Sequence, residues 1–164
     1  MRAVVQRVKE GSVAIEGKIH SRIGKGLVVL LGIRKGDTKE VATFLAERCV
    51  NLRLFQDSAG KMNLSIGEVG GGVLVDSQFT LYADTLKGNR PGFSDAAQAD
   101  EAELLYNDFV DRMTSRLGKE KVLTGVFRAM MEVTIVNDGP VTMILEDREN
   151  SVKIKEINKR SLNP

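Results

Sequence analysis

The sequence predicts an α+β fold, with mostly antiparallel strands in layered or barrel-like sheets and two amphipathic helices packed on one side. Many apolar segments of strand length are separated by turn residues, whereas only two segments have helical spacing. The two kinds of segment do not alternate as a βαβα pattern requires. The 164 residues, 42% apolar and 28% charged, favour a single globular domain.

The N-terminal part predicts antiparallel strands followed by a central one. Residues 3–8 and 12–16 alternate apolar and polar side chains, with Gly11 near the turn between them, and residues 19–23 continue the pattern. Residues 26–33 form a nearly continuous apolar run of strand length, which is typical of a strand buried on both faces.

Two helices are predicted from capping patterns. Asp37 is followed three residues later by Glu40, and Asp100 by Glu103, as in helix N-terminal capping boxes. The second helix is expected to end near Gly118. The apolar positions with helical spacing are Val41, Phe44, Leu45 and Cys49 in the first helix, and Leu104, Leu105, Phe109 and Met113 in the second.

The remaining apolar segments predict further strands and their connections. The strands are expected at residues 52–55, 71–75, 122–127, 131–136 and 141–146. Turn residues dominate 57–61 and 88–93. Residues 150–164 are polar and basic, so we expect a domain over residues 1–149 followed by a flexible tail, which is either solvated or in contact with RNA.

Composition excludes several function classes. No apolar run reaches the roughly 20 residues of a membrane span, and the charged N-terminus is unlike a secretory signal, so a cytoplasmic protein is expected. The single histidine, His20, and the single cysteine, Cys49, cannot build a zinc cage. Cys49 is expected to be a core residue. The phosphate-binding motif G-x-x-x-x-G-K-[ST] and the dinucleotide-binding motif G-x-G-x-x-G after a strand are also missing, so no metal and no cofactor are expected.

Two polar strings interrupt apolar strands, which is where a rigid sheet can position functional groups. The first is DSQFTL at 76–81, which contains Ser77, Gln78, Phe79 and Thr80. Their hydroxyls and amide could orient a carbonyl or a water, or merely satisfy backbone groups at a strand end. They lack an obvious base to activate a nucleophile.

The second string contains Gly139-Pro140, which is either a turn between two strands or a backbone feature with a function. A cis bond there would redirect the flanking carbonyls, which could hold an ammonium group. Arg7, within an apolar strand, is either a snorkelling edge residue or a guanidinium that fixes a loop of carbonyls.

These strings, in their order and spacing, resemble the D-aminoacyl-tRNA deacylases. The resemblance covers residues 1–147 and is carried by QRV at 6–8, GLVVLLGI at 26–33, GKMN at 60–63, SQFTL at 77–81, GNRPGF at 88–93 and NDGPVT at 137–142. SQFTL and NDGPVT together are specific, and either alone would be weak.

The resemblance implies an enzyme that hydrolyses the ester of D-aminoacyl-tRNA, and of mischarged glycyl-tRNA, as chiral proofreading in translation. It implies a homodimer with active sites at the interface, the tRNA 3′ end as partner, and neither membrane nor DNA. Ser77, Gln78, Phe79 and Thr80 would form the catalytic floor, with either Thr80 or the tRNA 2′-hydroxyl driving attack. Substrate would be bound by Gly139-Pro140 of the partner subunit, in the cis form, and by Arg7, Asn137 and Thr142.

The sequence departs from the family pattern at two places. Gly92 stands where serine is usual, which could loosen its loop, and Arg128 replaces a small residue, which could add a phosphate contact or be solvated. Two alternatives to a chiral deacylase remain: a nucleic-acid-binding module that has lost catalysis, and a relaxed-chirality deacylase that acts on mischarged L-alanyl-tRNA.

Overall fold

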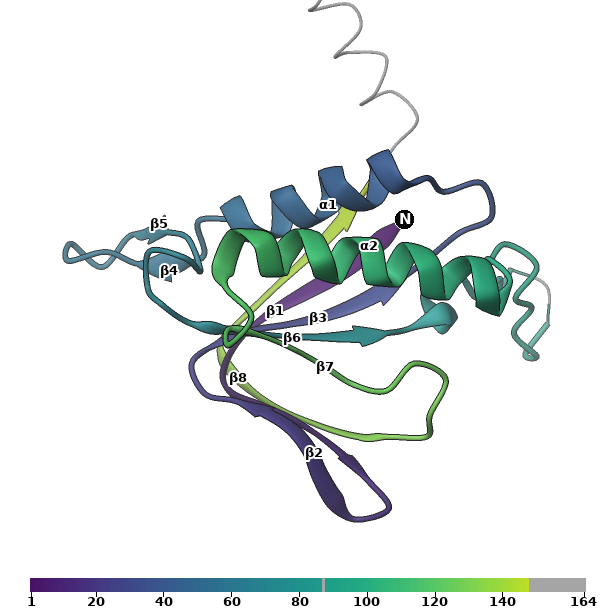
Figure 1. Cartoon of the computed structure of the whole chain (residues 1–164), viewed down its shortest axis with the longest axis horizontal. Helices are drawn as coiled ribbons and strands as arrows, with labels where there is room; N and C mark the ends of the chain where they lie inside the picture. Colours follow the sequence, from purple (N-terminus) through teal and green to yellow (C-terminus); the bar gives the residue numbers. More distant parts are fainter. Residues whose placement is uncertain (87, 148–164) are drawn as a thin grey trace, which may run out of the picture.

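The computed structural model describes residues 1–86 and 88–147, so the expected tail at 150–164 lies outside the described residues. A sheet with the strand order β2-β1-β3-β6-β7, to which β8 is added along β1, lies under two helices (Figure 1). The strands are β1 (Arg2–Ile15), β2 (Lys18–Ile23), β3 (Gly26–Gly32), β4 (Phe55–Gln56), β5 (Met62–Leu64), β6 (Gly72–Ser77), β7 (Val122–Thr124) and β8 (Glu132–Glu146). The helices are α1 (Lys39–Asn51), the 3₁₀ helix η1 (Phe79–Tyr82) and α2 (Ala99–Leu117).

Two long strands, β1 and β8, run through the sheet. In each of them the sequence predicted two shorter strands joined by a turn, and this prediction is wrong. Residues 3–8 and 12–15 belong to one strand, β1, and Gly11 lies inside it. Gly11 sits where β1 changes partner from β3 to β2, and a Cβ there would lie 2.7 Å from Val28 Cγ2, so close packing explains the glycine. Likewise, residues 132–136 and 141–146 belong to one strand, β8, which pairs antiparallel with β1 along its length.

The sheet is mixed. Pairings of β1 with β2, β3 and β8 are antiparallel, as predicted, whereas β3–β6 and β6–β7 are parallel. Parallel neighbours need crossover connections, and α1 and α2 lie within them. The sequence pattern missed these because β4, β5 and η1 interrupt the alternation of strand and helix.

The helices lie side by side across one face of the sheet (Figure 1). The main core fills the space between them and the sheet, with Phe55, Phe109, Leu45 and Met113 fully buried. Cys49 belongs to this core, as expected, and burial raises its thiol pKa to about 12. Leu104 was predicted on the apolar face of α2, but it is 69% exposed.

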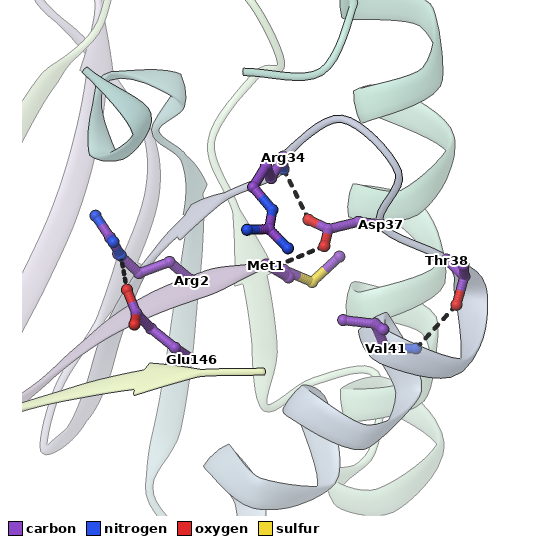
Figure 2. Close-up of polar contacts among 7 residues, drawn as sticks. All are labelled: Met1, Arg2, Arg34, Asp37, Thr38, Val41 and Glu146. Carbon is purple, nitrogen blue, oxygen red and sulfur yellow. Dashed lines mark hydrogen bonds and ion pairs between the residues drawn. The ribbon is translucent and has the colours of Figure 1, made fainter. Parts of the chain in front are cut away.

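Both predicted capping boxes are wrong. The N-cap of α1 is Thr38, whose hydroxyl accepts from the Val41 amide (Figure 2). The Asp37 carboxylate is occupied instead by the Met1 ammonium at 2.6 Å and by the Arg34 amide (Figure 2). At α2 the N-cap is Gln98, without a side-chain hydrogen bond. The C-terminal end of α2 at Gly118 is confirmed.

The other half of the sheet curls toward a barrel. There β2 and the first half of β8 extend away from the helices, opposite α1 and α2 (Figure 1). A second cluster of buried residues, including Val13, Ile23, Val28 and Leu74, fills this half. The Ser21 hydroxyl donates to the Thr124 carbonyl at 2.9 Å, which links β2 to the end of β7. The expected barrel-like layering is therefore present.

The remaining features are peripheral. Strands β4 and β5 form a separate small hairpin around the predicted turn at 57–61, and the strand expected at 52–55 begins only at Phe55. Within residues 1–86 and 88–147, no helix is long and apolar enough to cross a membrane.

Candidate active site

The SQFT string, Ser77 to Thr80, lies at the carboxyl end of β6. Ser77 is the last residue of the strand and pairs with Leu31, and the Gln78 amide donates to the Leu31 carbonyl at 2.8 Å. The chain then turns into η1, whose first residues are Phe79 and Thr80. The first amides of a helical turn have no acceptor within it, so these two N–H groups begin η1 without an intrahelical partner.

In this string Phe79 and Thr80 are exposed, whereas Ser77 and Gln78 are half-buried. The Gln78 side-chain amide donates to the Thr80 hydroxyl oxygen at 2.5 Å. Phe79 is 59% exposed and meets Phe93 in an edge-to-face contact, with ring centroids 5.0 Å apart. The structure thus gathers all four predicted catalytic residues at one strand end.

Arg2 supports η1 and was not predicted. Its guanidinium donates to the Leu81 carbonyl at 2.5 Å, lies 5.1 Å from the Tyr82 ring centroid, and pairs with Glu146 on β8 (Figure 2). It connects η1 to the sheet. Sequence gives no signal for this because the contacts join residues 79 and 144 positions apart.

Gly139-Pro140 lies in a large bulge of β8, and not in a hairpin turn. In the register of β1 with β8, Gln6 is opposite Thr142 and Val8 is opposite Asn137. Residues 138–141 therefore face the single residue between Gln6 and Val8. The Gly139-Pro140 bond is cis, which settles the isomer that the residues alone left open, and both residues are exposed.

Arg7 is the residue opposite the bulge, and it is only 7% exposed. Its Nε donates to the Asp138 carbonyl at 3.0 Å and lies 3.4 Å from Asp138 Oδ2. Its Nη1 donates to the Leu54 carbonyl. A buried guanidinium needs several acceptors, and these provide them, so Arg7 is not a snorkelling edge residue.

The bulge also gathers the other predicted substrate-binding residues. Asn137 and Thr142 flank it and are exposed, and the Thr142 hydroxyl lies 3.4 Å from the Gln6 side-chain amide. Gly139 has a φ of +132°, and a Cβ there would lie 2.9 Å from the Val141 nitrogen, so the backbone has no room for a side chain.

The SQFT string and the bulge that carries Gly139-Pro140 do not meet within one chain. Ser77 on β6 pairs with Leu31 on β3, which in turn pairs with Ala3 on β1. Arg7, which lies opposite the bulge, is four residues further along β1. With about 4.8 Å between strands and about 3.3 Å per residue, the bulge on β8 lies roughly 20 Å from Ser77.

A pocket of about 570 Å³ adjoins the SQFT string. It is lined by Ser77, Gln78 and Phe79, and by apolar side chains that include Phe127, Met130 and Met131. Its walls come from β6, from the segment between β7 and β8, and from the N-terminus of α2, none of which the sequence placed together.

Asp76 lines the same pocket; the sequence placed it at the start of the first polar string but predicted no role for it. It is 3% exposed, and burial raises the pKa of its carboxyl, an effect that the Ser77 amide opposes. In the sequence it is simply the first polar residue after an apolar run, so only the fold reveals that it is buried.

Of the two residues that depart from the family pattern, Arg128 lies at this pocket. Arg128 lines it, is exposed, and has a φ of +65°, a conformation that suits glycine better. The loop around Gly92 is not loosened at that residue, because the Gly92 amide and carbonyl both pair with Asp84, at 2.9 and 2.7 Å.

Neither histidine-based catalysis nor a metal site is supported among the described residues. His20 is exposed on β2, away from the pocket lining. Among residues 1–86 and 88–147, no three His, Cys, Asp or Glu side chains cluster as a metal site requires.

Comparisons with known proteins agree on one family. The family model described as D-Tyr-tRNA(Tyr) deacylase matches residues 4–146. A D-aminoacyl-tRNA deacylase of Alkaliphilus metalliredigens is 53% identical over 149 residues, covering 91% of this chain and 99% of that protein. One from Chlorobaculum tepidum is 52% identical over 146 residues, covering 89% and 97%.

Two solved structures share the fold. A structure named c-Myc DNA Unwinding Element Binding Protein has a TM-score of 0.86 and 42% identity, covering 90% of this chain and 99% of that one. A probable eukaryotic D-amino acid tRNA deacylase has a TM-score of 0.76 at 17% identity, covering 88% and 97%, and it supports the fold alone.

Proposed function

The chain belongs to the D-Tyr-tRNA(Tyr) deacylase family and is a hydrolase of D-aminoacyl-tRNA, and from this premise we propose how its residues perform the reaction. The enzyme cleaves the ester between a D-amino acid and the terminal adenosine, and so frees the tRNA as a proofreading step of translation. The match over residues 4–146, with relatives about half identical along nearly their whole length, carries this assignment. We infer from such a substrate that the enzyme acts in the cytoplasm.

The ester is held at the start of η1. The N–H groups of Phe79 and Thr80 are the donors for the ester carbonyl oxygen, which becomes negatively charged in the transition state. Ser77 and Gln78 complete the floor beside the pocket. Preorganised backbone donors of this kind stabilise charge without moving during the reaction.

Thr80 is not the nucleophile in this proposal. Its hydroxyl oxygen accepts from the Gln78 side-chain amide, a donor that cannot remove a proton. His20 is exposed on another strand and is not in the pocket lining. The 2′-hydroxyl of the terminal ribose therefore assists the attack of water.

Gly139-Pro140 is the chiral filter. The exposed backbone of the bulge receives the substrate's α-ammonium and occupies the space that an L side chain needs, whereas a D side chain points away. Arg7 holds the bulge through the Asp138 carbonyl, and Asn137 and Thr142 flank it. Glycine has no side chain to reject, so mischarged glycyl-tRNA is also cleaved.

A filter about 20 Å from the ester-binding residues cannot act within one chain, since one aminoacyl ester is far smaller than that gap. We propose a homodimer in which each site combines the SQFT string of one subunit with the bulge of the other. Val4 on β1 and Leu30 on β3 are paired, and they lie near the midpoint between the SQFT string and the bulge of the same chain. A two-fold axis passing near this pair exchanges the groups and builds two equivalent sites.

The face around Val4 suits such an interface. Ala3 and Val5 belong to the core under the helices, so Val4 and its partners Leu30 and Ile144 point to the opposite face. Ile144 is 66% exposed there, which is costly for a large apolar side chain in a monomer. A hollow of about 890 Å³ is lined in part by Val4, Leu81 and Ile144.

The assay compares D-Tyr-tRNA with L-Tyr-tRNA at equal enzyme concentration. We expect free D-tyrosine to be released while L-Tyr-tRNA persists. Survival of both esters at high enzyme concentration would contradict the assignment, and rapid loss of both would contradict the chiral filter.

A further inference from the structure

Asp76 is a buried carboxyl in the pocket beside the ester site, and the reaction described above gives it no role. We propose that Asp76 is a specificity residue that binds the amine-bearing edge of the terminal adenine of the tRNA. This inference rests on the proposed function, because that function brings the terminal adenosine to the SQFT string.

The fold buries Asp76 without a charged partner. None of the ion pairs formed within residues 1–86 and 88–147 includes it. Gly125 leaves the space that the carboxyl fills, because a Cβ at that position would lie 2.8 Å from Asp76 Oδ1. The backbone amide of Ser77 donates to this carboxyl, which has capacity for further donors, so its place in a pocket wall points to a ligand.

The surrounding pocket has the character of a nucleobase site. Phe127, Met130 and Met131 provide apolar and aromatic walls, and the volume of about 570 Å³ lies in the range of small-molecule sites. Bases bind by stacking on aromatic rings and by hydrogen bonds to a few polar groups. Asp76 is the acidic group of this lining, and it directly precedes Ser77 of the ester site.

The chemistry of the carboxyl matches adenine. Adenine presents an amine donor beside a ring-nitrogen acceptor on its Watson–Crick edge. The carboxyl accepts from the amine in either protonation state, and its protonated form also donates to the ring nitrogen. An asparagine side chain offers the same donor and acceptor pair, whereas valine offers neither.

Binding of two analogues that the enzyme cannot hydrolyse tests whether Asp76 recognises the adenine amine. In both, an amide replaces the ester of the D-tyrosyl nucleoside; one carries adenosine and the other purine riboside, which lacks the amine. Calorimetry on the full-length protein measures each dissociation constant. We expect the wild type to bind the adenosine analogue about 5- to 10-fold more tightly, the effect of one hydrogen bond.

The variants separate recognition from structure. Asp76→Asn should keep the preference for adenosine, and Asp76→Val should lose it while still melting cooperatively. Asp111→Asn, which removes an exposed carboxylate on α2, is the matched control and should keep the wild-type preference. Equal binding of both analogues by the wild type, or a preserved preference in Asp76→Val, overturns the proposal.

Hydrolysis of D-Tyr-tRNA, measured in parallel, separates this inference from the proposed function. Cleavage without a preference between the analogues refutes only the role of Asp76. A preference without cleavage refutes the proposed function and leaves Asp76 as a base-binding residue.

Discussion

Arg7 and Asp138 face each other across the β1–β8 pair, with Arg7 Nε 3.0 Å from the Asp138 carbonyl oxygen and 3.4 Å from its Oδ2. This contact fixes the segment that carries Gly139-Pro140. A strand of the sheet therefore holds the proposed chiral filter in place through one buried side chain.

Arg7→Ala should inactivate the enzyme and destabilise it. It removes the donors to the Leu54 and Asp138 carbonyls, and each buried acceptor left unpaired costs about 1–3 kcal/mol. We expect a loss of at least tenfold in kcat/KM for D-Tyr-tRNA and a lower Tm in thermal unfolding. Arg22→Ala, at an exposed arginine paired with Glu10, is the control and should leave both quantities near wild type. Full activity in Arg7→Ala would show that the bulge needs no such support.

Gly139→Ala should abolish activity through the backbone. Its Cβ would lie 2.9 Å from the Val141 nitrogen and 3.2 Å from Arg7 Nη2, and the φ of +132° disfavours any side chain. Gly60→Ala provides the control, because Gly60 also has a positive φ but nothing within 4 Å of the added Cβ. The control should lose only about 1 kcal/mol of stability and keep its kcat/KM. Equal activity of the two variants would contradict the role of the bulge.

Thr80→Ala should retain most activity, within about tenfold of wild type, because only a hydrogen bond with Gln78 is removed. A substrate whose terminal ribose lacks the 2′-hydroxyl should instead be cleaved far more slowly. Single-turnover rates with the two substrates measure both effects. A drop of several orders of magnitude in Thr80→Ala, with the deoxy substrate unaffected, would identify Thr80 as the nucleophile.

Asp76→Asn should stabilise the protein at neutral pH. Burial raises the folded-state pKa of Asp76, so the folded state binds the proton more tightly and stability falls as pH rises from the unfolded pKa of about 4 through the folded one. Asparagine carries no proton to lose, so its contribution to stability stays constant over this range. The Tm difference between variant and wild type should therefore grow from pH 4.5 to pH 8. A difference that does not change with pH would mean that the pKa of the carboxyl is the same in the folded and unfolded states.

The sequence predicted the strands of the core because burial imposes a clear pattern on them. The run at 26–33 became the central strand β3, and α2 ended at Gly118 as expected. Glycine and proline misled the prediction at Gly11 and Gly139-Pro140, where they mark a change of strand partner and a bulge instead of turns.

The site was predictable only as separate strings of residues. Sequence order placed Ser77 to Thr80 at a strand end, which the structure confirms. The contact of Arg2 with η1 and the burial of Asp76 both depend on residues that are distant in the sequence. The local pattern of apolar and polar residues therefore does not predict them.

The central claim is that each active site is shared between two subunits, and mixed dimers test it most directly. One chain carries Gly139→Ala and the other Phe79→Pro, which removes a backbone N–H proposed to hold the ester carbonyl; each is expected to be inactive as a homodimer, and differently tagged chains allow the mixed dimer to be purified. The shared-site account predicts about half of the wild-type activity per dimer on D-Tyr-tRNA, because one site then receives an intact SQFT string and an intact bulge. An inactive mixed dimer would contradict it, since each chain would then need both elements within itself.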